Sequence, residues 1–157
     1  MVKALLVGFL LMGVTVGVHA VGTALWLRFL RRRRGEMAGP LRPWRALKLL
    51  GLTALFLLAL QMVEVVLWAV TYLMIPQVGD LKTFEQAVYF STVTFTTLGY
   101  GDLTLTGHWR LLSGMEAMNG ILLIGWSTAL LFAVVQRLLP QSAEVAPHDE
   151  DKRASVK

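Results

Sequence analysis

The chain has 157 residues, of which 55% are hydrophobic, and it carries a formal net charge of +5 and no cysteine. A mean hydropathy of +0.60 over this length leaves room for little beyond membrane segments. Because the sequence has no His/Glu metal spacing, no phosphate-binding loop and no nucleophile beside a base, we expect neither an enzyme nor a bound cofactor.

Three apolar stretches are long enough to cross a membrane: residues 4–30, 47–75 and 109–139. Each exceeds the roughly 20 residues that cross a hydrocarbon core of ~30 Å. A fourth apolar stretch, residues 83–95, is too short to span. It begins with Thr83 and Gln86 at capping-box spacing, which predicts a helix from about 83 to 96. Lipid cannot satisfy the ends of so short a helix, so we expect it to be re-entrant and surrounded by protein.

The basic residues are distributed unevenly about these stretches. Of the 15 lysines and arginines, all but Lys3, Lys82 and Arg110 lie around the connection between the first two stretches or towards the C-terminus. Lysine and arginine accumulate on the cytoplasmic side of membrane proteins. We therefore expect the N-terminus outside and the C-terminus in the cytoplasm. The high sequence pI of 10.0 then follows from this topology, and we expect no binding of nucleic acid.

Residues 31–46 are expected to form a basic cytoplasmic linker with turns at its glycines and prolines. The linker begins with Arg31, Arg32, Arg33 and Arg34, which either bind anionic lipid head groups, at ~1 kcal/mol each, or only set the topology. Residues 140–157 are short and polar, and they are expected to form a disordered cytoplasmic tail.

The first apolar stretch also resembles a signal peptide, with Lys3 before it and Ala20 at a cleavage-like position. The apolar run continues past Ala20 to residue 30, which favours a retained membrane helix. Gly13 and Gly17 form a small-residue pair suited to close helix packing, although glycine is common in membrane helices in general. His19 is expected to be packed or hydrogen-bonded rather than a pH sensor or a ligand.

Residues 96–102 read Thr-Thr-Leu-Gly-Tyr-Gly-Asp and lie between the second and third spanning stretches. A stripped cation needs oxygen atoms in place of its water, and backbone carbonyls supply them where glycine permits the backbone angles. In this membrane context the run resembles the selectivity filter of the potassium channel pore-loop family, and the resemblance covers about residues 47–139. Leu98 is a mild departure, because valine or isoleucine is commoner there.

The resemblance implies that K⁺ binds to the backbone carbonyls of four residues, closed below by the Thr97 hydroxyl. The implied filter comprises Thr97, Leu98, Gly99, Tyr100 and Gly101, with K⁺ at the first four of these. Thr96 and Asp102 would support the filter from either side. Tyr89 and Phe90 stand where the family often has tryptophans that brace the filter tyrosine, and Val93 replaces a glutamate that some relatives pair with the aspartate.

The resemblance also gives the third spanning stretch a role. Gly120 matches a hinge glycine of the inner helix, which would let the cytoplasmic half swing. A row of residues spaced by four would line the path below the filter, namely Ile124, Thr128, Phe132 and Gln136. Helix packing by small residues is an equal alternative for Thr128.

Two acids lie within the spanning stretches, Glu64 and Glu116. A charged side chain facing lipid at this depth costs about 2.5–3.5 kcal/mol, so both are expected to face protein and to support the filter. The expected partners are the hydroxyls of Thr92, Thr94 and Thr96 and the filter backbone, and Asn119 is a candidate member of the same network.

These features together predict an all-α membrane protein with three transmembrane helices and, between the second and third, a re-entrant pore helix and an extended filter. Its parts are an N-terminal helix (1–30), the linker (31–46), a pore domain (47–139) and the tail (140–157). The resemblance implies a homotetramer that conducts K⁺ passively, in a prokaryotic cytoplasmic membrane. The alternatives are a weakly selective cation channel and a non-conducting auxiliary or scaffold subunit.

Overall fold

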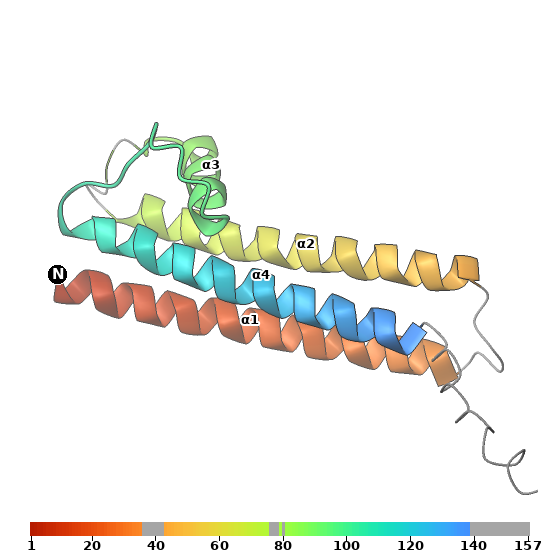
Figure 1. The fold of residues 1–157 in the computed structure, drawn as a ribbon. Helices are drawn as coiled ribbons and strands as arrows, with labels where there is room; N and C mark the ends of the chain where they lie inside the picture. The colour runs from red at the N-terminus through yellow and green to blue at the C-terminus, as the bar shows by residue number, and fades with distance from the viewer. Residues whose placement is uncertain (36–42, 76–78, 80, 139–157) are drawn as a thin grey trace, which may run out of the picture.

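The computed structural model describes residues 1–35, 43–75, 79 and 81–138, and within these ranges every regular element is a helix. The long helices lie side by side, with a short helix at one end of them (Figure 1). The long helices are α1 (Val2–Gly35), α2 (Pro43–Met74) and α4 (Arg110–Leu138). The short helix is α3 (Phe84–Phe95), and a single 3₁₀ turn, η1 (Gly107–Trp109), precedes α4.

The three long helices confirm the three predicted spans. Segments Val2–Arg33, Pro43–Met74 and Gly107–Arg137 are long and apolar enough to cross a membrane. The helices take up both ends of the predicted linker, because α1 runs on to Gly35 and α2 already begins at Pro43. Proline suits the first position of a helix, where its missing N–H has no intrahelical acceptor. The rest of that linker, 36–42, and the predicted tail, 140–157, lie outside the described residues.

The predicted start of α3 is confirmed atom by atom. The Thr83 hydroxyl accepts a hydrogen bond from the Gln86 amide at 3.2 Å, and the Gln86 side chain accepts one from the Thr83 amide at 3.2 Å. This reciprocal capping box satisfies two of the free N–H groups of the first turn. The Gln86 side chain also accepts from the Lys82 amide at 2.9 Å.

Helix α1 packs along α4 and α2 through one face that recurs every three to four residues. The buried positions on this face are Ala4, Gly8, Leu11, Thr15, His19 and Thr23. The hydroxyls of Thr15 and Thr23 donate to the carbonyls of Leu11 and His19 in the preceding turn. Such bonds let hydroxyl-bearing residues lie in an apolar interface without an unpaired donor.

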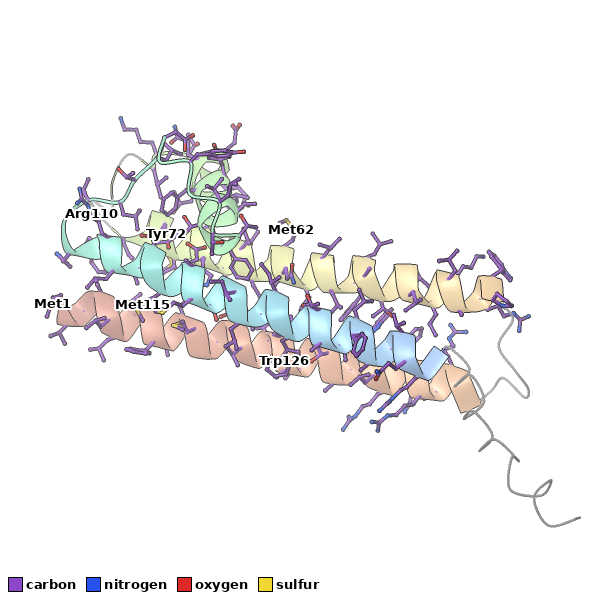
Figure 2. All side chains as sticks on the ribbon, in the orientation of Figure 1. Met1, Met62, Tyr72, Arg110, Met115 and Trp126 are labelled. Atoms are coloured by element: carbon purple, nitrogen blue, oxygen red, sulfur yellow. The ribbon has the colours of Figure 1, made fainter. Side chains whose placement is uncertain are left out.

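The glycines that bring α1 close to its neighbours are Gly8 and Gly22, and not the predicted pair. A Cβ at Gly8 would overlap the Met115 sulfur on α4, and one at Gly22 would lie 2.9 Å from Leu60 on α2. Figure 2 shows Met115 between α4 and α1. Gly13 and Gly17 lie on the exposed face, with open space around them. Their spacing is therefore right for close packing, but they face away from α2 and α4.

The core lies where α2, α3 and α4 meet. Its largest fully buried apolar side chains are Trp68 and Tyr72 from α2, Phe95 from α3, and Leu112 and Leu123 from α4. Aromatic contact continues this packing, since the rings of Tyr72 and Phe90 meet edge to face at 5.3 Å between centroids. This core holds α3 against the two long helices at one end of the bundle.

Helix α3 ends against α4 at Gly120, where the two backbones come unusually close. A Cβ at this glycine would collide with the Phe95 carbonyl oxygen and would lie 2.8 Å from the Phe95 carbonyl carbon. The closest atoms belong to backbone, which cannot rotate away as a flexible side chain could. Glycine is therefore needed here for close approach, whether or not α4 also bends at this point.

We predict that Gly120→Ala displaces the end of α3 and lowers the unfolding free energy by about 1–3 kcal/mol, as overpacking does. The matched control is Gly125→Ala, five residues along the same helix, where a Cβ meets open space. Thermal unfolding of the purified protein in detergent measures both. Equal melting temperatures for the two variants would show that the close contact with Phe95 does not constrain the fold.

Candidate functional site

The chain after α3 turns back along the helix instead of leaving it (Figure 1). Three successive amides donate hydrogen bonds to carbonyls in the last turn of α3. The Thr97 amide bonds the Thr94 carbonyl at 2.9 Å, and the Leu98 and Gly99 amides bond the Val93 carbonyl at 2.9 and 3.2 Å. The last carbonyls of a helix lack intrahelical partners, so these bonds satisfy the end of α3 and turn the N–H groups of residues 97–99 towards it.

The backbone of this segment alternates between conformations. φ is +61° at Thr97, +56° at Gly99 and +79° at Gly101, while Leu98 and Tyr100 between them have no positive φ. A strand with negative φ throughout points successive carbonyls to opposite sides, whereas this alternation turns them to the same side. Within the described residues, no hydrogen bond is donated to the carbonyls of Thr97 to Tyr100. The segment thus presents a row of free carbonyl oxygens on the side away from α3.

Thr97 is the one non-glycine residue in the described part of the chain with a positive φ. Such a backbone angle is costly for a β-branched side chain, and strained residues concentrate at functional sites. Two hydrogen bonds fix the Thr97 backbone, one from its own amide to the Thr94 carbonyl and one from the Leu98 amide to the Val93 carbonyl. The strain is therefore maintained by the end of α3.

Asp102 is tied back to α3 by a hydrogen bond that the sequence alone did not indicate. The Tyr89 hydroxyl donates to the Asp102 carboxylate at 2.9 Å. This hydrogen bond to a carboxylate raises the pKa of the Tyr89 phenol above its usual value, so the phenol remains a neutral donor at physiological pH. Tyr89 thus provides Asp102 with a hydrogen-bond partner on α3, which the apolar side chain of Val93 cannot provide.

The expected bracing of Tyr100 by Tyr89 and Phe90 does not occur within one chain. The Phe90 ring is buried in the core and packs on Tyr72 of α2. The Tyr89 hydroxyl bonds Asp102 and not Tyr100. Tyr100 is 68% exposed and Leu98 is 56% exposed. Both side chains are therefore open in the single chain.

A cavity of about 630 Å³ lies between α3, residues 97–105 and the first half of α4. Its lining includes Tyr89, Val93, Thr97, Asp102 and Ala117. The cavity therefore borders both the segment with free carbonyls and the helix that leads away from it.

Glu116 joins the three helices around this site. Its carboxylate accepts a hydrogen bond from the Tyr72 hydroxyl on α2 at 2.6 Å and another, short one from the Ser91 hydroxyl on α3. The Ser91 oxygen also lies 2.9 Å from the Val65 carbonyl on α2. Figure 2 shows Tyr72 at the end of α2 nearest α3. Glu116 thereby fixes α3 in the angle between the two long helices.

The prediction that both acids face protein is confirmed, since Glu64 and Glu116 are fully buried, but the predicted partners are wrong. Glu64 is bonded to His19 of α1, whose Nδ1 lies 2.8 Å from the carboxylate. The hydroxyls of Thr92 and Thr96 instead donate to carbonyls of their own helix, at Val88 and Thr92. A threonine inside a helix can always reach the previous turn, so it is a poor candidate for a distant acceptor.

Asn119 likewise belongs to a different network from the one expected. Its amide donates to the Thr15 hydroxyl on α1 at 2.7 Å, and among the described residues no hydrogen bond joins it to Glu64 or Glu116. Glu64, Glu116 and Asn119 therefore serve contacts between helices, and His19 is hydrogen-bonded as predicted.

The predicted pore-lining residues share one face of α4, at spacings of four. Thr128, Phe132 and Gln136 are exposed on this face, and Ile124 is partly buried. The Thr128 hydroxyl donates to the Ile124 carbonyl at 2.9 Å, so it has an acceptor within its helix. The face is open in the single chain, and its function stays a prediction.

Comparison with known proteins bears on this arrangement as a whole. A sequence profile described as an ion channel matches residues 52–137, more than half of the chain. The chain belongs to this ion channel family. No curated protein and no solved structure gives a significant match. The matched range runs from within α2 through α3 to the end of α4, and α1 lies outside it.

Membership of the ion channel family confirms the resemblance to a small pore-loop channel. Together with three helices of membrane-spanning length, it identifies an integral membrane protein. It also indicates a channel rather than an enzyme. Residues 97–101 lie within the matched range, between helices α2 and α4, which we call the channel unit together with α3.

Sequence reasoning missed Tyr72 and Ser91 as partners of Glu116 and His19 as the partner of Glu64. A signal for the second pair was present, because His19 and Glu64 are each a lone titratable group deep in an apolar span. A buried charge needs a partner, and groups on separate spans can supply one another. Ser91 and Tyr72 carried no such signal.

We predict that Glu116→Gln lowers the unfolding free energy by about 1–3 kcal/mol, because a buried hydroxyl is left facing an NH₂ group. Tyr72→Phe and the double variant complete a thermodynamic cycle, measured by denaturant unfolding in detergent. The single substitutions should cost more in sum than the double. Strictly additive costs would show that Tyr72 and Glu116 do not interact.

Proposed function

We propose that this channel is selective for potassium and conducts it passively through a pore formed by four copies of the chain. The observation that carries the proposal is the alternation of φ at Thr97, Gly99 and Gly101, with the intervening amides bonded to α3. The free carbonyls of Thr97, Leu98, Gly99 and Tyr100 supply the oxygen ligands that replace the water of K⁺.

The number of copies follows from the shape of the site. One strand contributes one row of oxygens, and four such rows enclose an ion on all sides. A homotetramer with a four-fold axis brings them together, as closed symmetry requires. The exposure of Tyr100 and Leu98 in the single chain supports this arrangement, because neighbouring copies would cover them. Thr96 and Asp102 support the strand at its two ends, the latter through Tyr89.

In the proposed orientation the N-terminus and residues 97–101 face the outside of a prokaryotic cytoplasmic membrane, and the C-terminus lies in the cytoplasm. Helix α3 is re-entrant, and its C-terminal end points towards the centre of the membrane. The negative end of a helix dipole favours a cation there by up to about 2 kcal/mol. Anionic lipid head groups would bind at the cytoplasmic end of α1, at Arg31, Arg32 and Arg33, with Arg34 completing the run.

The proposed conduction path continues below the filter along α4. Ile124, Thr128, Phe132 and Gln136 line it, and Gly120 is the hinge above them. Gly120 lies against the Phe95 backbone at the end of α3, so the proposed hinge would adjoin the proposed filter. A movement of the lower half of α4 would therefore pivot about a fixed upper half.

Flux into liposomes loaded with potassium or sodium tests the proposed selectivity directly. A potassium-selective channel gives uptake of a potassium tracer that sodium does not replace. Equal flux of both ions would favour a weakly selective cation channel, and a tetramer without flux would favour an auxiliary or scaffold subunit.

We predict that potassium raises the melting temperature of the tetramer more than an equal concentration of sodium. A ligand bound only by the assembled state stabilises it by about 2.7 kcal/mol at a hundredfold excess over Kd. Gly99→Ala should abolish both this difference and the flux, because alanine is strained at φ +56°.

The control for this prediction is Gly51→Ala on α2, where a Cβ meets open space and the helical backbone accepts alanine. It should retain the difference between the two ions. Potassium flux that persists in a folded Gly99→Ala tetramer would remove the basis for a filter at residues 97–101.

A further inference from the structure

Three polar side chains in the membrane spans are fully buried, and each has one atom without a protein partner. Within the described part of the chain these atoms are Oε2 of Glu64, Nε1 of Trp68 and Oδ1 of Asn119. None of the three side chains has any exposed surface. A buried polar atom without a hydrogen bond is costly, so each of these atoms requires a partner.

Trp68 lies on the side of α2 that meets both α1 and α4. It follows Glu64 by one helical turn and Gln61 by two, and residues at these spacings share one face of a helix. On this face Glu64 bonds His19 of α1, at 2.8 Å. Gln61 bonds Ser127 of α4, at 3.0 Å. The indole of Trp68 therefore lies in the junction that α1, α2 and α4 enclose.

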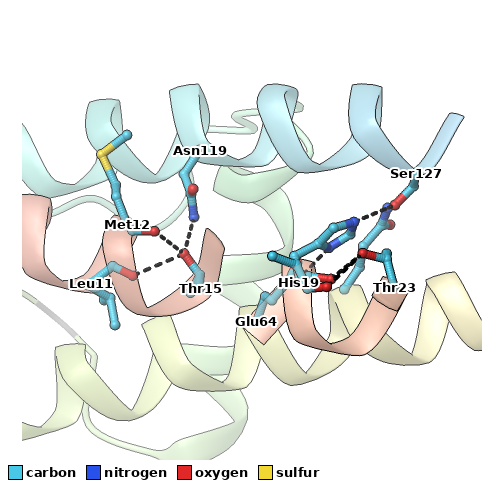
Figure 3. A network of polar contacts seen from close by, with 10 residues as sticks. Leu11, Met12, Thr15, His19, Thr23, Glu64, Asn119 and Ser127 are labelled. Carbon is cyan, nitrogen blue, oxygen red and sulfur yellow. Dashed lines mark hydrogen bonds and ion pairs between the residues drawn. The ribbon is translucent and has the colours of Figure 1, made fainter. Parts of the chain in front are cut away.

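The three residues also lie at nearly the same level of the bundle. Figure 3 shows the Asn119 amide turned towards Thr15 of α1. Glu64 bonds His19, which is one turn further along α1. Helix α2 runs antiparallel to α1 (Figure 1), so Trp68, one turn beyond Glu64, returns to the level of Thr15. All three residues thus lie within about one turn, ~5.4 Å, of one another along the bundle.

Thr15 determines which way the Asn119 amide faces. The Thr15 hydroxyl has one proton, and it donates to the Leu11 and Met12 carbonyls, each at 3.0 Å. It can therefore only accept from Asn119. The NH₂ group of Asn119 is thereby held at Thr15, and its oxygen is left for another donor.

The three unpartnered atoms complement one another as hydrogen-bonding groups. Nε1 of Trp68 carries a proton and only donates, whereas the Asn119 oxygen and an ionised Glu64 oxygen only accept. One water molecule matches this set, because it accepts from the indole and donates its two protons to the two oxygens. A cation at the same place would face the positive end of the indole N–H.

We propose that one water molecule is bound in the junction of α1, α2 and α4, held by Trp68, Glu64 and Asn119. Three hydrogen bonds are typical of a buried water. The site is separate from the proposed conduction path. Asn119 lies on the buried face of α4, two and a half turns before the exposed Thr128, which places them on opposite faces.

The bound water accounts for the carboxylate in the middle of α2. Among the described residues, the Glu64 carboxylate receives one hydrogen bond, from His19. A buried carboxylate is accommodated only where further hydrogen bonds replace its hydration. The water supplies such a bond to Oε2. It also joins α2 to α4 at the level where Asn119 already joins α4 to α1.

A crystallographic or cryo-EM map of the purified whole chain, at a resolution that shows ordered water, tests the site directly. Density is expected about 2.7–3.2 Å from each of the three atoms. It should not strengthen when potassium is replaced by thallium, a heavier monovalent cation. A map without this density, or with a direct bond from Trp68 to Glu64 or Asn119, overturns the proposal. Stronger density with thallium overturns the assignment as water.

NMR of the chain labelled with ¹⁵N-tryptophan tests the same site in detergent. The indole signal that disappears in Trp68→Phe should show a dipolar cross-peak to water in the parent. Asn119→Leu removes one acceptor, and this cross-peak should be lost. A parent without the cross-peak, or an unchanged cross-peak in Asn119→Leu, contradicts a water held by all three residues.

The matched control is Thr15→Val, which removes the other hydrogen-bond partner of Asn119 and leaves the three proposed ligands in place. The cross-peak of Trp68 should survive this substitution. Its loss would trace the signal to the Thr15 hydroxyl and overturn the site. If Asn119→Leu does not fold, the map and the cross-peak of the parent still decide. None of these measurements involves ion flux, so they test the site whichever ion the pore prefers.

Discussion

The end of α3 sets the constraint on which the site depends. Its last carbonyls lie inside the protein, where a polar group without a partner is costly. The chain meets this requirement by turning back, so that the amides of Thr97, Leu98 and Gly99 bond Thr94 and Val93. That turn requires a positive φ at Thr97 and Gly99 and leaves the carbonyls free on the opposite side. The row of oxygens is thus a consequence of how one helix is terminated.

The long helices decide where this terminated helix sits. Gly120 lets the Phe95 backbone approach α4, and Glu116 bonds Tyr72 on α2 and Ser91 on α3 at once. One contact is steric and the other polar, and both involve the same half of α4. The position of the carbonyl segment is therefore coupled to α4, the helix that also carries the proposed path.

Helix α1 is joined to α2 and α4 by buried polar contacts, which a helix that only anchored the chain in the membrane would not need. His19 and Thr15 bond partners on α2 and α4 in a fully buried interface. Buried polar contacts specify the alignment of helices more strongly than apolar packing, because a shift leaves groups unpaired. The register of α1 is thereby defined against both helices of the unit.

The sequence by itself determined the three spans, the capped start of α3 at Thr83 and the place of residues 96–102, because these depend on local composition and spacing. It also required Glu64 and Glu116 to face protein, since lipid would not accept them. Only the tertiary structure decided which partners they meet, because His19, Tyr72 and Ser91 lie on other helices whose rotation no local pattern specifies. For the same reason Gly13 and Gly17 had suitable spacing and still face outward, while Gly8 and Gly22 face the contacts.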